Sequence, residues 1–218
     1  MPSVVAVNLS PAASAAALDA LTGLGFGLSL IVAIGAQNTF VLRQGLRREH
    51  VGAVVAVCML SDVVLISAGV AGAGALLGAV PWLATVMRWG GAAFLLVYAA
   101  LAARRALRPT GAALDADTGR VPAGLGSAVG TAMALTWLNP HVYLDTLVLL
   151  GSVAGGHGDG RWWFGAGAIL GSVVWFTALG YGARLLRPLF ARPRAWRVLD
   201  GAIAVVMTAI AVGLVAGA

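Results

Sequence analysis

The chain of 218 residues has no lysine, a single cysteine and only eight acidic residues. Cys58 alone cannot form an internal disulfide or a dithiol relay, and cysteine or histidine spacing typical of a metal site is absent. The sequence also lacks a His/Glu metal set, a Gly-x-Ser-x-Gly elbow and a nucleophile placed beside a base. We therefore expect a protein that is not an enzyme and holds neither a metal nor another cofactor.

Charge is scarce as well, because charged residues make up 10% of the chain and hydrophobic residues 60%, with a mean hydropathy of +0.93. Six apolar stretches each reach the ~20 residues with which a helix crosses ~30 Å of hydrocarbon. We predict an all-α, polytopic membrane protein with six transmembrane helices in a single domain over residues 1–218. The stretches cover residues 21–42, 51–80, 82–103, 125–150, 162–183 and 198–218.

Twelve of the 14 arginines lie in alternate gaps, after the first, third and fifth stretches, and the other side holds only Arg88 and Arg161. Short loops rich in basic residues stay cytoplasmic, so both chain termini are predicted to lie outside. The same arrangement places the net charge of +6 beside anionic lipid headgroups. This explains the positive charge, and we do not expect the protein to bind nucleic acid.

The longest gap, residues 104–124, is rich in Pro, Gly and Asp and is predicted to be a cytoplasmic linker. It separates two halves of three stretches, at about residues 21–103 and 125–218. Because three is odd, halves that share a fold would be inverted, as in many transporters with a site near the midplane. Ser61 and Gly91 have counterparts at Ser172 and Gly201, which supports a 3+3 inverted repeat.

Acids inside the stretches need a reason, because an ionised side chain near the centre of a membrane helix costs about 2.5–3.5 kcal/mol. Asp62 lies about eleven residues into the second stretch, roughly 16 Å deep along a helix. We interpret it as a binding or proton-carrying carboxylate. The alternative is a structural hydrogen-bond hub with Ser61 or a neighbouring helix. Asp200 lies at the end of the last stretch near Arg197, where a local ion pair would explain it.

The fourth stretch contains the dense polar run Thr136-Trp-Leu-Asn139-Pro140-His141-Val-Tyr143-Leu-Asp145. Pro140 cannot donate to a helix and disfavours helical geometry at Asn139, so a break is predicted. Membranes tolerate the freed carbonyls only where protein or a water-filled cavity satisfies them. Asn139, His141 and Asp145 suit a substrate site, and the last two lie one turn apart on one face. The alternative is an ordinary proline kink satisfied by local side chains.

The first stretch contains a comparable polar segment, Gly35-Ala36-Gln37-Asn38. Its two adjacent carboxamides could offer donors and acceptors to a zwitterion, or they could simply bridge helices. Trp137 and Trp175 lie deeper than the other tryptophans and could wall a cavity.

Taken in order, these motifs resemble the LysE-type family of basic amino acid exporters, the lysine and arginine export permeases. The resemblance covers residues 22–215, and its most specific part is the run around Asn139-Pro140. A departure is Ala36, where many relatives carry proline, although Gly35 still permits a break. The other matching motifs are Gly35-x-Gln37-Asn38, Arg43-Gln-Gly-Leu-Arg47-Arg48, Ser61-Asp62 and Trp89-Gly90-Gly91.

The resemblance implies a secondary transporter in the bacterial cytoplasmic (inner) membrane that exports L-lysine, L-arginine or close analogues. Its helix breaks would lie at Gly35 and Pro140. The residues expected to contact substrate are Gln37, Asn38, Asp62, Asn139, His141, Tyr143 and Asp145.

Moving one positive charge outward against an inside-negative potential costs about 2.3 kcal/mol per 100 mV, so export needs coupling. Exchange for an inward proton would cancel the charge movement, and Asp62 or Asp145 could carry that proton. An exporter of neutral amino acids or another small metabolite, and less readily a passive channel, are the alternatives. A bundle this small could also pair as a homodimer.

Overall fold

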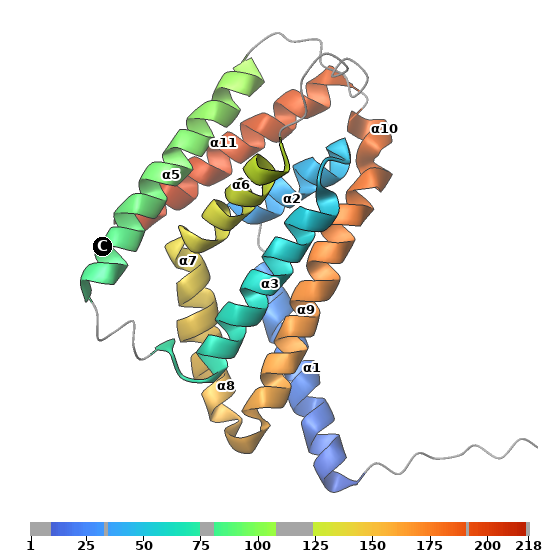
Figure 1. Cartoon of the computed structure of the whole chain (residues 1–218), viewed down its shortest axis with the longest axis vertical. Helices are drawn as coiled ribbons and strands as arrows, with labels where there is room; N and C mark the ends of the chain where they lie inside the picture. Colours follow the sequence, from blue (N-terminus) through green and yellow to red (C-terminus); the bar gives the residue numbers. More distant parts are fainter. Residues whose placement is uncertain (1–9, 33–34, 75–80, 108–123, 191, 217–218) are drawn as a thin grey trace, which may run out of the picture.

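The computed structural model describes residues 10–32, 35–74, 81–107, 124–190 and 192–216, and these ranges contain helices and no strand (Figure 1). Five helices within them are long and apolar enough to cross a membrane. The described part of the chain is therefore all-helical, with the several long apolar helices of a polytopic membrane protein. The five segments are Pro11–Ile31, Val51–Val70, Arg88–Leu107, Gly158–Leu186 and Arg194–Ala216.

Two of the predicted stretches are broken. The first, residues 21–42, spans the end of α1 (Pro11–Ile31) and the start of α2 (Ala36–Arg47), and Gly35 is the N-cap of α2. The fourth, residues 125–150, consists of α6 (Leu125–Trp137), α7 (Pro140–Tyr143) and the π-helix η2 (Leu144–Leu150), and α8 (Gly151–Gly156) follows it. Asn139 has an extended backbone (φ −95°, ψ 107°), as the residue before a proline prefers. This break is why residues 125–150 supply none of the five long helices.

The other helices depart from the predicted stretches at their ends. α3 (Val51–Val70) stops well short of residue 80, because Gly72 adopts a positive φ of 95° and Ala73 N–H bonds back to the Ala68 carbonyl. This is a glycine-terminated helix end, which apolar flanking residues concealed. α5 (Pro81–Leu107) continues through Arg104 and Arg105 into the predicted linker. The rest of that linker, residues 108–123, lies outside the described residues.

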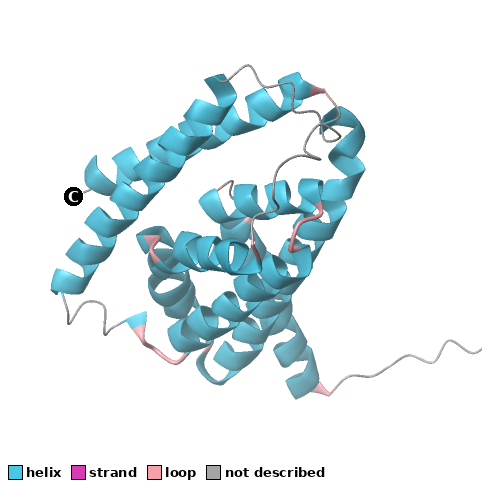
Figure 2. Cartoon of the chain, turned by 45° about the horizontal axis from the view of Figure 1, so that its top comes forward, coloured by secondary structure: helices cyan, strands magenta, loops and turns pink. Residues whose placement is uncertain are grey.

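The remaining α-helices of the described ranges are α9 (Arg161–Gly182), α10 (Arg187–Phe190) and α11 (Pro193–Ala216), and the short 3₁₀ helices η3 (Gly158–Gly160) and η4 (Ala183–Leu186) flank α9. α5 and α11 lie side by side and form an outer pair along one side of the bundle (Figures 1 and 2). On the other side, α9 packs along α1 and also against α3. The largest apolar core joins the two sides through buried residues of α2, α3, α5, α6, α9 and α11.

Glycines bring α1 and α9 into close contact. A Cβ atom on Gly23 would overlap the backbone carbonyl of Phe164, and one on Gly167 would overlap that of Ala20. Lipid gives no hydrophobic drive for helix association, so close backbone approach supplies the packing instead. α1 is held to the bundle largely along this surface.

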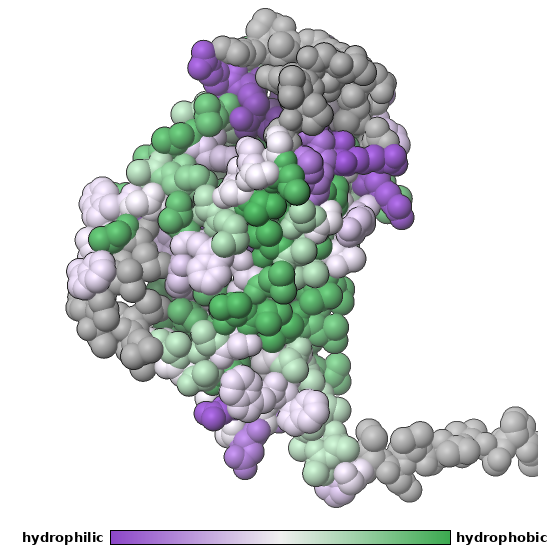
Figure 3. All heavy atoms as spheres, viewed as in Figure 1, coloured by the Kyte–Doolittle hydropathy of each residue, from purple (hydrophilic) through white to green (hydrophobic). Residues whose placement is uncertain are grey.

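The hydrophilic surface is concentrated at two ends of the molecule, with an apolar belt between them (Figure 3). Exposed Leu60, Val64, Val97 and Val205 illustrate the belt, whose side chains suit contact with lipid. The end of α2, the end of α5 and the start of α11 meet at one of these two ends, and each contributes arginines. We call it the arginine-rich end. Its described arginines include Arg43, Arg47, Arg48, Arg104, Arg105, Arg194 and Arg197.

Candidate substrate site between two helix breaks

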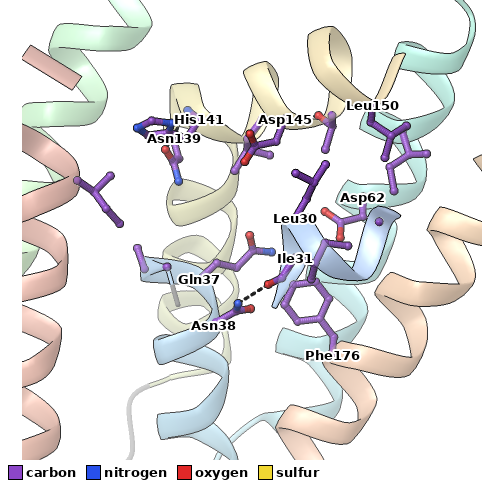
Figure 4. Close-up of a pocket in the computed structure, with 17 residues that line it drawn as sticks. Leu30, Ile31, Gln37, Asn38, Asp62, Asn139, His141, Asp145, Leu150 and Phe176 are labelled. Atoms are coloured by element: carbon purple, nitrogen blue, oxygen red, sulfur yellow. Dashed lines mark hydrogen bonds between the residues drawn. The ribbon is translucent and has the colours of Figure 1, made fainter. Parts of the chain in front are cut away.

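A cavity of about 310 Å³ lies where the two helix breaks approach each other (Figure 4). This volume is at the lower end of the range of about 300–1,000 Å³ for small-molecule sites. The start of α2 supplies one wall, and α7 and η2 supply another, with α3 between them. The polar lining residues are Gln37, Asn38, Asp62, Asn139, His141, Asp145 and Thr146, and apolar ones include Leu30, Ile31, Ile66, Leu150, Phe176 and Ile210.

Six of the seven residues expected to contact substrate line this cavity, and Gly35 lines it as well. Tyr143 is the exception. Its hydroxyl donates to the Trp137 carbonyl at 2.8 Å, and its ring meets the Trp137 ring edge-on. The hydrogen bond satisfies a carbonyl at the end of α6, so Tyr143 braces the helix break. The six that line the cavity are Gln37, Asn38, Asp62, Asn139, His141 and Asp145.

At the first break, the Asn38 side chain holds three helices together. Its Nδ2 donates to the Ile31 carbonyl at the end of α1 at 2.6 Å, and its Oδ1 accepts from Trp175 Nε1 of α9 at 3.2 Å. Gln37 is less engaged. Apart from a weak contact with the Cys58 thiol, its buried amide nitrogen has no hydrogen-bond partner in the described part of the chain. Asn38 is therefore tied to the neighbouring helices at the break, whereas Gln37 lines the cavity.

At the second break, side chains satisfy the interrupted backbone. Asn139 Oδ1 accepts from the His141 N–H at 3.1 Å and so caps α7. Trp137 Nε1 donates to Ser61 Oγ on α3 at 3.0 Å, which fixes the end of α6. His141 and Asp145 then follow on α7 and η2 and border the cavity together (Figure 4).

Asp62 is the most deeply buried carboxylate of the cavity, with 4% of its surface exposed. Ser172 Oγ of α9 donates to its Oδ2 at 2.6 Å, but no arginine among the described residues pairs with it. A buried carboxylate without a cation is costly unless it binds a proton or a cationic ligand. Asp62 therefore gives the cavity the chemistry to hold a positive charge.

Sequence reasoning missed the role of two residues of α9. Ser172 was noticed as a repeat counterpart, yet it is the hydrogen-bond partner of Asp62, and Trp175 anchors Asn38 without lining the cavity. No short-range signal could reveal these contacts, because α9 is far from α2 and α3 in sequence. The described ranges contain no group of three His, Cys or acidic residues able to hold a metal ion.

Asp200 lies away from the cavity, and its ion pairs differ from the one expected. Its carboxylate pairs with Arg43 at 2.5 Å and Arg105 at 3.1 Å, whereas the sequence suggested the neighbouring Arg197. Arg197 is exposed and Asp200 is buried, so the two side chains leave α11 toward different surroundings.

Replacing Trp175 with Phe is expected to lower stability modestly, because it removes the bond to Asn38 and keeps an aromatic ring. Interhelical hydrogen bonds in membranes contribute about 0.6 kcal/mol on average. Thermal unfolding in detergent would measure the loss. Trp162→Phe, at a tryptophan that is 52% exposed, is the matched control and should leave the midpoint unchanged. Equal midpoints for the two variants would argue against the anchoring role.

Comparison with known proteins identifies relatives over most of the chain. The family model for the LysE type translocator matches residues 28–217. A Mycobacterium tuberculosis protein provisionally named as an amino-acid transporter is 54% identical over 185 residues, covering 85% of this chain and 90% of that protein. The lysine exporter LysE of Corynebacterium glutamicum is 40% identical, covering 89% of this chain and 97% of that protein.

The arginine exporter protein ArgO of Salmonella schwarzengrund is 41% identical, covering 87% of this chain and 89% of that protein. No solved structure matches the chain. Family match and identity agree over nearly the whole length, and they agree with the motifs at both helix breaks. The chain therefore belongs to the LysE-type translocator family.

Proposed function

We propose that this protein is a secondary transporter that exports L-lysine and L-arginine from the cytoplasm in exchange for protons. The observation that carries the proposal is Asp62, a buried carboxylate that borders the cavity and has no cationic partner among the described residues. A lysine ammonium, an arginine guanidinium or a proton would each supply the missing positive charge. The names of the lysine and arginine exporters among its relatives point to the same substrates.

The start of α2 is suited to the other end of the substrate. Gly35 caps α2 without a side chain, so no N-cap side chain occupies the start of this helix. The positive end of a helix dipole favours an anion, and broken transporter helices use such ends to hold substrate carboxylates. We place the α-carboxylate beside Gly35 and Gln37 and the side-chain cation beside Asp62. His141 and Asp145 complete the polar wall opposite α2.

The proposed coupling of substrate export to proton import follows from the need to keep the charge of Asp62 balanced. In this proposal Asp62 holds either the substrate cation or a proton, and Asp145 is the second candidate for this role. Releasing the cation outside and accepting a proton there lets the carboxylate return without leaving a bare buried charge. The exchange also cancels the outward movement of positive charge, which would otherwise cost about 2.3 kcal/mol per 100 mV.

The proposal also assigns a topology. Six crossings, two of them broken, would put both termini outside and the arginine-rich end in the cytoplasm of a bacterial inner membrane. The breaks α1–α2 and α6–α7 then correspond, as do α3 with α9 and α5 with α11, in a 3+3 inverted repeat. In support of this, α5 packs along α11 and α3 packs against α9. One copy of the chain forms the cavity, so the proposal does not require the homodimer that the sequence left possible.

Feeding cells with dipeptides tests the proposed substrates directly. Cells loaded with lysine- or arginine-containing dipeptides should accumulate less of the free amino acid when this protein is present, because it exports the hydrolysis product. Alanine-, leucine- and threonine-containing dipeptides serve as neutral controls and should give equal accumulation with and without it. Lower accumulation of the neutral amino acids alone would instead identify a neutral amino acid exporter. Efflux insensitive to the proton gradient would indicate a channel.

A further inference from the structure

A second buried carboxylate lies outside the cavity, at the arginine-rich end. We call Asp200, Arg43 and Arg105 the Asp200 cluster. Asp200 Oδ1 accepts from Arg43 Nη1 at 2.5 Å and from Arg105 Nε at 3.1 Å, so one oxygen joins α11 to α2 and to α5. The side chains of Asp200 and Arg43 are only 8% and 11% exposed. The cluster therefore ties the outer pair α5–α11 to α2, the helix whose first turn borders the cavity.

Aromatic rings lie against both guanidinium groups of the Asp200 cluster. The Trp196 ring lies 6.0 Å from the Arg43 guanidinium, and the Tyr98 ring lies 6.0 Å from that of Arg105. Trp196 is itself fixed, because its Nε1 donates to the Phe190 carbonyl at 2.9 Å. Cation–π contacts and reduced exposure make these ion pairs less screened than pairs on an open surface.

Buried apolar residues separate the Asp200 cluster from the cavity along each helix. On α11, Ile203 and Met207 lie between Asp200 and Ile210, which lines the cavity. On α2, Phe40 and Val41 lie between Asn38, which lines the cavity, and Arg43. On α3, Val54 and Cys58 lie between the start of the helix and Asp62. All six of these intervening residues are buried, Met207, Val41, Val54 and Cys58 completely. Buried apolar side chains of α2, α3 and α11 thus fill the layer between the cavity and the arginine-rich end in the described part of the chain.

We infer that the Asp200 cluster is a latch that keeps the arginine-rich end closed, and that Asp200 is a positioning residue for the transport cycle. The inference rests on the proposed function, in which substrate enters from this end. In this inference, substrate reaches the cavity when α2 separates from the α5–α11 pair, and that movement breaks the ion pair between Arg43 of α2 and Asp200 of α11. Arg105 lies on α5 and stays paired with Asp200. Losing the charge-assisted bond to Arg43 from the closed state alone shifts a two-state population toward the open state by about tenfold or more.

The single native cysteine reports on this opening, because Cys58 is 0% exposed and lies in the closed layer. The rate of its alkylation by N-ethylmaleimide is measured on the purified full-length protein in nanodiscs without substrate. Asp200→Asn should react at least about tenfold faster than the unmodified chain, whereas Asp200→Glu, which keeps the charge, should react at nearly the unmodified rate. Arg105→Gln should react at nearly the unmodified rate, because Asp200 keeps Arg43 and Arg105 lies on the same helix pair as Asp200.

Matched controls separate a latch from general loosening. Asp159→Asn and Arg104→Gln change exposed charges and should leave the rate unchanged. In a Cys58→Ala background, a cysteine at the buried Ala154 of α8 should not become more reactive when Asp200→Asn is added. If Asp200→Asn does not fold, the triple variant Arg43→Gln, Asp200→Asn and Arg105→Gln, which leaves no buried charge unpaired, takes its place.

An unchanged Cys58 rate in Asp200→Asn or in the triple variant would overturn the latch, as would equal acceleration at positions 58 and 154. Acceleration by Asp200→Glu equal to that by Asp200→Asn would also overturn it. The labelling experiment uses no substrate. The latch can therefore be tested even if the dipeptide experiment shows no export of lysine and arginine.

Discussion

Replacing Asp62 with Asn is expected to abolish proton-coupled export of lysine and arginine while leaving the protein folded and inserted in the membrane. Asn has nearly the same size as Asp and can still accept the Ser172 hydrogen bond, so the packing of α3 against α9 is kept. The amide carries no charge and takes up no proton at physiological pH. It therefore neither pairs with the substrate cation nor returns a proton.

The expected loss of substrate affinity follows from the lost bond between the Asp62 carboxylate and the substrate cation. A hydrogen bond to a charged group contributes about 1.5–3 kcal/mol, so substrate affinity should fall by about 10- to 100-fold. Efflux of radiolabelled arginine from proteoliposomes measures transport, and a binding titration on the purified protein measures affinity. Asp159→Asn, which changes an exposed acid in the short 3₁₀ helix Gly158–Gly160, is the control for loss of one carboxylate. Undiminished efflux in Asp62→Asn would remove Asp62 from the mechanism.

Gly69→Ala, which adds one methyl group outside the cavity lining, is expected to disrupt the site by moving two helices that carry its residues. A Cβ atom there would overlap the Thr146 carbonyl of η2, and a Cβ atom on Gly151 would approach the Gly69 carbonyl at 2.6 Å. These are contacts between two backbones, so a change of side-chain rotamer cannot relieve them. Gly69→Ala must push η2, which carries Asp145, away from α3, which carries Asp62.

Overpacking of this kind costs about 1–3 kcal/mol. For a chain of this size, each kcal/mol lowers the melting temperature by about 2–4 °C, so a drop of roughly 2–12 °C is expected in detergent. Arginine efflux should fall at least about tenfold as the two carboxylates separate. Gly130→Ala is the matched control, because nothing lies within 4 Å of its added Cβ. If Gly69→Ala and Gly130→Ala behave alike, α3 and η2 do not approach as closely as described.

The residues of the cavity could be chosen from the sequence because polar groups inside apolar stretches are expensive and therefore rare. Asn139 and Asp145 stood out for this reason, and Pro140 marked the interruption beside them, since proline excludes helical geometry at the preceding residue. The same logic selected Gln37 and Asp62 without any knowledge of how the helices pack. This reasoning was sufficient for these four residues, whereas Tyr143 was chosen although it lies outside the cavity lining and Thr146 was not chosen although it lines the cavity.

The details that depend on packing could not be obtained this way. No residue type marks the π-helix at Leu144–Leu150, and the orientation of Tyr143 toward the Trp137 carbonyl follows from the geometry of the break. Likewise, the partners of Asp200 come from α2 and α5, far along the chain, whereas the sequence offered only the nearby Arg197. Helix ends were also misplaced where apolar residues continue past a glycine, as at Gly72.

The pH dependence of arginine binding to the purified protein tests most directly whether one buried carboxylate serves both the substrate cation and the proton. A proton and a guanidinium that compete for Asp62 require the affinity to rise with pH, by about tenfold per pH unit while the carboxyl is protonated, and to level off above that range. Asp62→Asn should bind weakly at every pH in the same range. Affinity that does not change with pH, or an unaltered pH profile in Asp62→Asn, would contradict the shared role of this carboxylate.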